Sequence, residues 1–451
     1  MDNTPYDSYC FFIHRLKIRT KVNLKADVLQ LSKDSQDPII VKLAQEINDA
    51  SDLIDTYFFS EKARSLKDIN RGELINSVDN YISMLAGLVG SKAYQPSQDS
   101  TTESAVAATT TNTINANTGD IQEINEDEIM DIENKKEKSS SQENNDKIRK
   151  NFKFTWTTVF GSERSTTFSD TLVEMMSVLF NLGVWYLGYS EYIISNKWSK
   201  TDGLSEDDRQ TVYDFLLKAA GIFESLRGSM FSSVAQEDKC TDFSDAILRT
   251  LYLQSMAQAQ EITVGRAFKK NTSASTITKL AVDTSSLYKE ARDCLESNYR
   301  EKMAEYRLEK FYNFIIYKIS LYESLAYQQQ AFALNCSHKY GEAIATAKKS
   351  QAILKKTLTS LVRPCVCITL SQETLTRPTS SLLPIIDSTL ARLERENKII
   401  GFQSIPDEIS PLPEGSRLVK VRSYVYPPVN AAWTFIDNIS SKFNSDKKIE
   451  S

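Results

Sequence analysis

The amino-acid sequence predicts a mainly α-helical protein with a tetratricopeptide-like helical core, a small β-sheet near the N-terminus and an extended C-terminal strap. Glycine (14) and proline (11) are scarce for 451 residues, whereas many-stranded sandwiches and barrels need frequent Gly- and Pro-rich turns. Apolar residues recur at helical spacing over most of the second half of the chain. Five of the eleven prolines fall within residues 399–429, which favours an extended segment there over a helix.

Composition excludes several classes of protein. Hydrophobic residues make up 41% of the chain, enough for a substantial core. The net charge of −5 argues against a protein that coats nucleic acid, which needs a dominant basic field. Six widely spread cysteines and an N-terminus without an apolar core region predict a reducing compartment. The most apolar stretch, residues 175–189, contains Asn181 and is too short to cross a bilayer.

The first third of the chain predicts a small β-element followed by helices. In residues 10–24, apolar and polar side chains alternate loosely and several side chains are β-branched. In residues 39–58 and 74–89, apolar residues recur at helical spacing. Residues 95–151 contain no aromatic residue or cysteine, so we expect a disordered polar and acidic insertion. We therefore expect two parts of one domain, residues 8–94 and 152–430, separated by this insertion and followed by a tail at 431–451.

After the insertion nearly every segment predicts a helix. Ser205 is expected to cap a helix that ends at Gly228. Further helices are expected at residues 242–268, 273–295 and 302–336. Small residues on both sides of a tight turn at 338–347 predict a tetratricopeptide-like hairpin. Residues 364–370 fit either a short strand or a linker to a final helix at 382–395.

Motifs for catalysis and metal binding are missing from the sequence. Only His14 and His338 are available as histidine acid–base groups, and there is no HExxH, GxSxG, GxxxxGK or GxGxxG motif. Cys365 and Cys367 have no second cysteine pair with which to bind zinc. We therefore predict a non-enzyme without a cofactor or metal, and an enzyme that uses carboxylates alone remains a weaker hypothesis.

Several motifs resemble the Bro-type (BRO domain) family of ESCRT-associated proteins. The matching segments are Phe154-x-Trp156-Thr157, Phe180-Asn181, residues 219–223 (AAGIF), residues 256–262 (MAQAQEI), residues 400–406 (IGFQSIP), residues 415–418 and Pro427-Pro428. Together they span nearly the whole chain apart from the insertion. The chain is most similar to Brox, the single-domain member, and is also related to Alix.

The resemblance implies a curved, banana-shaped helical domain whose concave face binds the C-terminal amphipathic helix of ESCRT-III subunits. It implies a partner surface built from Leu280 and Leu418 as apolar anchors, with Ile277 as an alternative anchor and Arg266 as a partner for a carboxylate. Thr276 and Thr263 stand where family members usually have an apolar or aromatic residue. We expect both Leu280 and Leu418 to be partly exposed.

Two departures from the family limit what the resemblance implies. Brox proteins typically end in a prenylation box, but Lys448 stands where the cysteine would be, so we expect membrane association to be indirect. Gly401 stands where Alix-like members carry a docking tyrosine. We predict a cytoplasmic, non-catalytic adaptor that is recruited to endosomal or nuclear-envelope membranes. The alternative is a scaffold of the same fold for a different signalling or membrane-linked partner.

Overall fold

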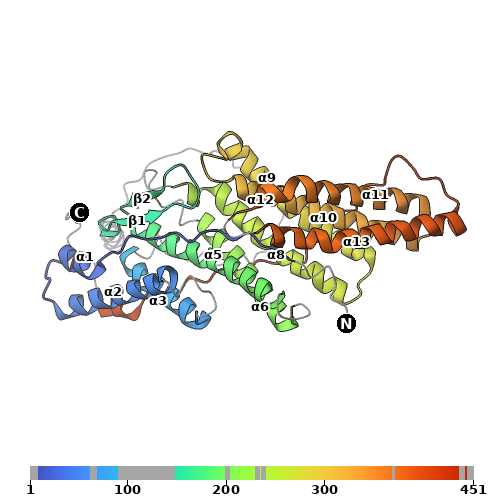
Figure 1. Ribbon diagram of the computed structural model, residues 1–451. Helices are drawn as coiled ribbons and strands as arrows, with labels where there is room; N and C mark the ends of the chain where they lie inside the picture. The colour runs from blue at the N-terminus through green and yellow to red at the C-terminus, as the bar shows by residue number, and fades with distance from the viewer. Residues whose placement is uncertain are drawn as a thin grey trace, which may run out of the picture.

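The computed structural model describes residues 9–60, 69–89, 148–198, 204–228, 234, 240–367, 371–435 and 442–443. Its main elements are α1 (Leu24–Leu31), α2 (Pro38–Phe59), α3 (Arg71–Val89), β1 (Phe154–Thr157), β2 (Ser165–Phe168), α5 (Thr171–Trp198), α6 (Glu206–Arg227), α8 (Asp245–Lys269), α9 (Ala274–Tyr299), α10 (Glu309–Cys336), α11 (Tyr340–Lys356), α12 (Val362–Cys365) and α13 (Gln372–Glu396). Figure 1 shows an elongated molecule with α1–α3 at one end and the tips of α10, α11 and α13 at the other. The prediction of a mainly helical protein with a small sheet is confirmed.

The core is built from helices that pack against their neighbours in the sequence, from α5 to α6, α8, α9, α10 and α11. Helix α5 contributes an apolar stretch, Thr171–Asn196, that is long and apolar enough to cross a membrane, but its most apolar part is entirely buried inside the protein. It extends beyond residues 175–189, the apolar stretch expected from sequence, and polar residues within it have partners inside the core. Asn181, for example, accepts a hydrogen bond from the backbone of Lys17 (2.8 Å) and donates one back (2.9 Å).

The sheet lies elsewhere than predicted. β1 and β2 pair antiparallel, whereas the N-terminal segment expected to form strands is extended and contributes one isolated bridge, between Arg19 and Trp156. The segment runs beside β1, where Thr157 N donates to Ile18 O (2.8 Å). The alternation in its sequence accompanies partial burial of this extended segment. Arg19, for example, reaches inward to Glu174, Asp55 and Tyr81.

Two boundaries also differ from the predictions. Ile148 and Asn151, assigned to the disordered insertion, are 1% and 8% exposed, so the polar segment ends earlier than expected; the rest of it lies outside the described residues. The final helix, α13, begins ten residues before the predicted start and contains Pro378 and Pro384. Packing explains this, because Leu375 and Pro378 are both buried and tertiary contacts outweigh helix propensity.

After α13 the chain forms the predicted strap, an extended segment that we define as residues 402–430. It crosses the helices in the reverse of their sequence order. Its contacts are, in turn, Ser404 with Gly341 on α11, Pro411 with Gln330 on α10, Ser416 with Lys279 on α9, Leu418 with Gln260 on α8, Arg422 with Asp214 on α6 and Tyr424 with Asp79 on α3. Beyond the strap, Trp433 is buried against Gly87 of α3 and donates to Met84 O (2.9 Å).

Candidate functional site

The strap is fixed over the seam between α8 and α9. Gln260 of α8 donates to Ser416 O (2.9 Å) and accepts from Leu418 N (3.4 Å), while Ser416 N donates to Lys279 O on α9 (3.0 Å). Arg417 adds an ion pair to Asp283 (3.3 Å). Backbone and side-chain bonds on both helices therefore hold this part of the strap in one position.

Leu418 lies on this fixed segment and is 56% exposed. Its backbone is bound to Gln260, so the exposed side chain is carried by an anchored part of the chain. The expectation that Leu418 is partly exposed agrees with the structure, and its role as an anchor for a partner stays a prediction. An exposed apolar side chain on a rigid support can be buried by the apolar face of an amphipathic helix.

The expectation that Leu280 is partly exposed is wrong. Leu280 and Ile277 are 2% and 3% exposed and belong to the main hydrophobic core. The cause is the side of α9 on which they lie, because that side packs between α8 and α10. Neither side chain can contact a partner while α9 keeps this position, and a groove with Leu280 and Leu418 as opposite walls is not present.

The remaining three predicted residues lie closer to the surface. Thr276 is exposed and Thr263 is partly exposed, with its hydroxyl bonded to Ala259 O (3.2 Å). Arg266 is already engaged by α6, donating to Glu206 (2.9 Å) and Gln210 (2.7 Å). A partner carboxylate would have to share this guanidinium with Glu206.

Helix direction places these residues on one side of the strap. α8, α9 and α10 are successive packed helices that alternate in direction. Thr263 follows the strap contact on α8, and Thr276 precedes the strap contact on α9, so both lie towards the α8–α9 turn. The C-terminal part of α10 lies on the same side, beyond its strap contact at Gln330.

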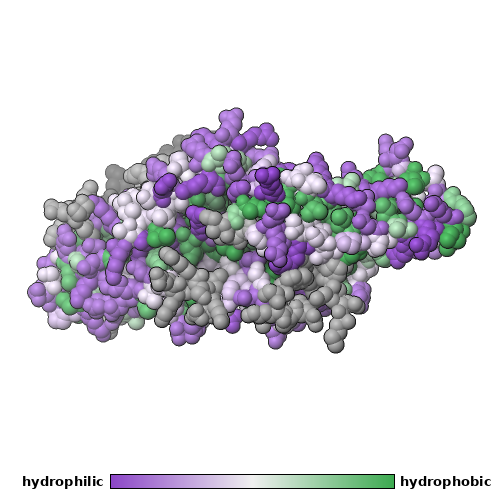
Figure 2. All heavy atoms as spheres, in the orientation of Figure 1, coloured by the Kyte–Doolittle hydropathy of each residue, from purple (hydrophilic) through white to green (hydrophobic). Residues whose placement is uncertain are grey.

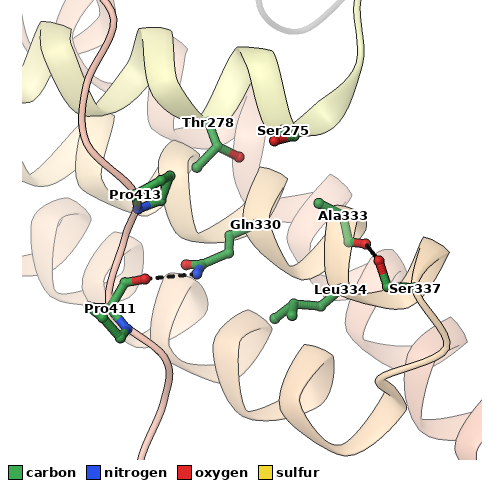
Figure 3. Close-up of a pocket in the computed structure, with 8 residues that line it drawn as sticks. All are labelled: Ser275, Thr278, Gln330, Ala333, Leu334, Ser337, Pro411 and Pro413. Carbon is green, nitrogen blue, oxygen red and sulfur yellow. Dashed lines mark hydrogen bonds between the residues drawn. The ribbon is translucent and has the colours of Figure 1, made fainter.

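A pocket of about 250 Å³ opens on this side of the strap. Figure 3 shows its lining: Ser275 and Thr278 from α9, Gln330, Ala333, Leu334 and Ser337 from α10, and Pro411 and Pro413 from the strap. Gln330 donates to Pro411 O (3.1 Å), and its buried carbonyl oxygen has no hydrogen-bond partner. The pocket therefore offers a hydrogen-bond acceptor between apolar proline and leucine side chains.

The surface from Leu418 to this pocket is richer in hydroxyl groups than the apolar strip that the resemblance implied. Sequence analysis did not identify the pocket, because the strap prolines that close it are about 80 residues from Gln330 in the chain. Periodicity indicates which side of a helix is buried, but it gives no sign of where a distant extended segment crosses that helix.

Buried ionisable groups elsewhere have structural partners. His14 is bonded to Gln254 (2.7 Å), and burial lowers its pKa to about 4. His338 is exposed in the α10–α11 turn beside Tyr340. Cys365 is buried and its burial raises its pKa to about 12. Among the described residues, no three His, Cys, Asp or Glu side chains are grouped so that they could hold a metal.

Comparison with known proteins identifies the family. A family model described as the BRO1-like domain matches residues 134–444, more than half of the chain. The chain belongs to the BRO1-like domain family. It is 27% identical to the mouse BRO1 domain-containing protein BROX over 307 residues, which cover 65% of this chain and 70% of that protein.

Solved BRO1 structures share the fold over almost the entire chain. One, described as an ALIX BRO1 CHMP4C complex, has a TM-score of 0.59 at 16% identity and covers 97% of this chain and 98% of its own. Another, described as the structural basis for endosomal targeting by the Bro1 domain, has a TM-score of 0.60 at 16% identity, covering 96% and 99%. The structural match thus extends to residues before 134, which the family model does not reach.

Proposed function

We propose that this BRO1-like protein is a non-catalytic adaptor that binds the C-terminal amphipathic helix of an ESCRT-III subunit beside its strap. The observation that carries the proposal is Leu418, an exposed leucine on a strap segment that is anchored to both α8 and α9. The related fold in a complex with CHMP4C supports the class of partner. We further propose recruitment from the cytoplasm to endosomal or nuclear-envelope membranes through this partner.

The proposed surface comprises Leu418, Thr263, Thr276, Arg266 and the pocket around Gln330. An amphipathic helix would place an apolar side chain on Leu418 and polar side chains along the threonines. Its acidic groups would compete with Glu206 for Arg266, so we expect charge to affect the association rate more than the final affinity. Thr263 and Thr276 stand where the family usually has apolar residues. We therefore expect lower affinity for the usual partner helix, or a partner helix with a different pattern of apolar residues.

The test compares two aspartate variants on the same strap. Leu418→Asp should weaken binding of an ESCRT-III tail helix at least about tenfold, because burying a leucine side chain contributes about 1.5–3 kcal/mol. Val425→Asp is the matched control, since Val425 is also exposed (81%) on the strap but lies past its α6 contact. Affinity is measured by titrating a labelled tail peptide into each purified variant, and thermal unfolding confirms that both remain folded.

Two results would contradict the proposal. If the wild-type protein does not bind ESCRT-III tail helices, the adaptor role fails and a scaffold for another partner becomes the better hypothesis. If Val425→Asp weakens binding as much as Leu418→Asp, the adaptor role stands but the site does not. Leu280→Asp should instead unfold the protein, because it places a charge at a position that is 2% exposed.

A further inference from the structure

The end of the molecule formed by α13 carries an exposed apolar turn. We define the tip as residues 395–405. Its apolar side chains are Ile399 (65% exposed), Ile400 (65%), Phe402 (77%) and Ile405 (44%). Figure 2 shows apolar atoms at this extremity, at the right-hand end of the view where α13 stops. Single exposed apolar residues are ordinary, but four within seven residues at one extremity indicate a contact surface.

The tip is held rigidly. Asn397 accepts from Phe402 N through its backbone (2.7 Å), and its side-chain amide exchanges two hydrogen bonds with Gln403 (2.9 and 3.0 Å). Gln403 in turn bonds His338 O (2.7 Å) and Gly341 N (3.1 Å) in the α10–α11 turn. The apolar side chains are therefore presented on a fixed backbone.

Phe402 has a backbone conformation that is costly for its residue type. Its φ is +49°, in the left-handed region that glycine and asparagine adopt most readily. A bulky aromatic residue is thus kept at a strained position, where its side chain is 77% exposed and gains little from the core. Strain of this kind, kept at a surface position, points to a role for the side chain outside the folded chain.

Charges around the tip favour an anionic surface. The carboxylates nearby are paired: Glu342 with Lys339 (3.3 Å), Glu394 with Lys348 (3.4 Å) and Glu396 with Arg392 (3.7 Å). Arg395 and Lys398, one helical turn apart and both exposed, form no ion pair with any described residue. Asp407 and Glu408 are exposed carboxylates that follow the tip in the chain, on the strap.

We propose that the tip makes a direct, reversible contact with the surface of an anionic membrane. Ile399, Ile400 and Phe402 would enter the boundary between headgroups and acyl chains, while Arg395 and Lys398 would lie among the anionic headgroups. A second protein is a poorer fit, because a stable protein interface needs about 20–30 residues on each side and the tip is one short turn. This contact is in addition to the indirect recruitment proposed above and does not depend on Leu418.

The experiment uses the full chain and phosphatidylcholine vesicles with and without about 30 mol % phosphatidylserine. Wild-type protein should sediment with the anionic vesicles. Ile400→Ser combined with Phe402→Asn should lower the partition coefficient at least about tenfold. Arg395→Gln combined with Lys398→Gln should remove most of the preference for phosphatidylserine. Each cation is expected to contribute about a fivefold gain in binding to the anionic vesicles.

Phe402→Asn alone separates binding from folding. Asparagine tolerates the left-handed conformation, so this variant should melt at the wild-type temperature or above it while binding vesicles several-fold more weakly. Ile39→Ser combined with Leu53→Ser is the matched control, because both residues are 43% exposed on α2, at the opposite end of the molecule. This control should bind vesicles as the wild type does.

Three outcomes would overturn the proposal. The first is no sedimentation of the wild-type protein with anionic vesicles. The second is equal loss of binding in the α2 control and the tip variants, which would indicate general surface hydrophobicity. The third is concentration-dependent self-association that Phe402→Asn abolishes, which would show that the tip binds a second copy of this chain.

Discussion

Two buried titratable side chains next to the N-terminal extended segment respond to pH in opposite directions. Glu191 accepts hydrogen bonds from Phe11 N (2.8 Å) and Ser195 (2.6 Å), but its burial dominates and raises its pKa to about 7. His14 is buried as a neutral ring, and its pKa falls to about 4. Each shift links the stability of this segment to pH.

The signs follow from the unfolded values of 4.5 for Glu191 and 6.5 for His14. Between pH 4.5 and 7, unfolded Glu191 releases a proton that the folded protein keeps, so this group lowers the free energy of unfolding as pH rises. Between pH 4 and 6.5, unfolded His14 holds a proton that the folded protein lacks, so this group raises the free energy of unfolding as pH rises. The two contributions largely cancel in the wild type.

Glu191→Gln removes only one of the two contributions. Relative to the wild type, its free energy of unfolding should rise by about 3 kcal/mol from pH 4.5 to pH 7, since each pKa unit corresponds to about 1.4 kcal/mol. Urea unfolding at several pH values measures this difference. Glu408→Gln, at an exposed position, should give a curve parallel to the wild type, and a parallel curve for Glu191→Gln would contradict the assignment.

Residue types alone could not separate exposed from buried candidates. Leu280 and Leu418 were both apolar residues matched to the family, yet one is in the core and the other is exposed. Helical periodicity is ambiguous for Leu280, because an apolar residue on α9 can face the core or a partner equally well. Leu418 lies in a segment without periodicity, so its exposure could be learned only from the structure.

At the scale of elements, the strap depends on two helical glycines that allow its backbone to approach closely. A Cβ at Gly221 of α6 would lie 1.7 Å from Arg422 O, and one at Gly341 of α11 would lie 2.1 Å from Ser404 O. No side chain can be accommodated there unless the strap or the helix moves. Glycine in these helices is therefore required by a segment about 60 to 200 residues away in the chain.

Gly221→Ala should displace the strap from α6 and destabilise the protein by about 1–3 kcal/mol. Hydrogen exchange should show faster exchange of strap amides while those of α8 and α9 stay protected. Gly72→Ala is the control, because its nearest neighbour would be 3.6 Å away, and it should be neutral or stabilising by about 0.5–1 kcal/mol. Unchanged strap exchange in Gly221→Ala would show that the strap is not held by this contact.

Elements with strong local signals were predicted well. The helix expected to be capped by Ser205 begins at Glu206, and Ser205 accepts from Asp208 N (3.0 Å) as a capping residue should. The strands were misplaced because the N-terminal segment and β1 are both extended and partly buried, and sequence alternation does not show which of them pairs with β2. β1 pairs with β2 in a local hairpin between Phe154 and Phe168, whereas the N-terminal segment bonds to β1 from the far end of the chain, through Ile18 O and Thr20 N.

At the scale of the whole molecule, the segments before and after residues 90–147 share one core. Arg19 forms an ion pair with Glu174, Lys17 with Asp242, and Trp433 packs on Gly87. The side chains of Lys17, Asp242 and Glu174 that make these contacts are fully buried. The two parts of the chain should therefore stay together without a covalent connection between them.

A protease recognition site inserted between residues 95 and 147 tests this directly. After cleavage, the two pieces should co-elute in size-exclusion chromatography under native conditions and separate only in denaturant. Lys17→Met, which leaves the buried Asp242 without its partner, should loosen the association by about 3–5 kcal/mol. Pieces that separate under native conditions would show that two independent domains flank this region.

The reversed order of the strap contacts has a consequence for synthesis of the protein. Chains are made from the N-terminus, and the helices that the strap crosses are all complete before residue 402 emerges. Leu418 and the pocket closed by Pro411 and Pro413 therefore form only after all of these helices have been made. A partner that recognises this surface can bind only after the strap has been made, and a nascent chain that still lacks the strap cannot compete for it.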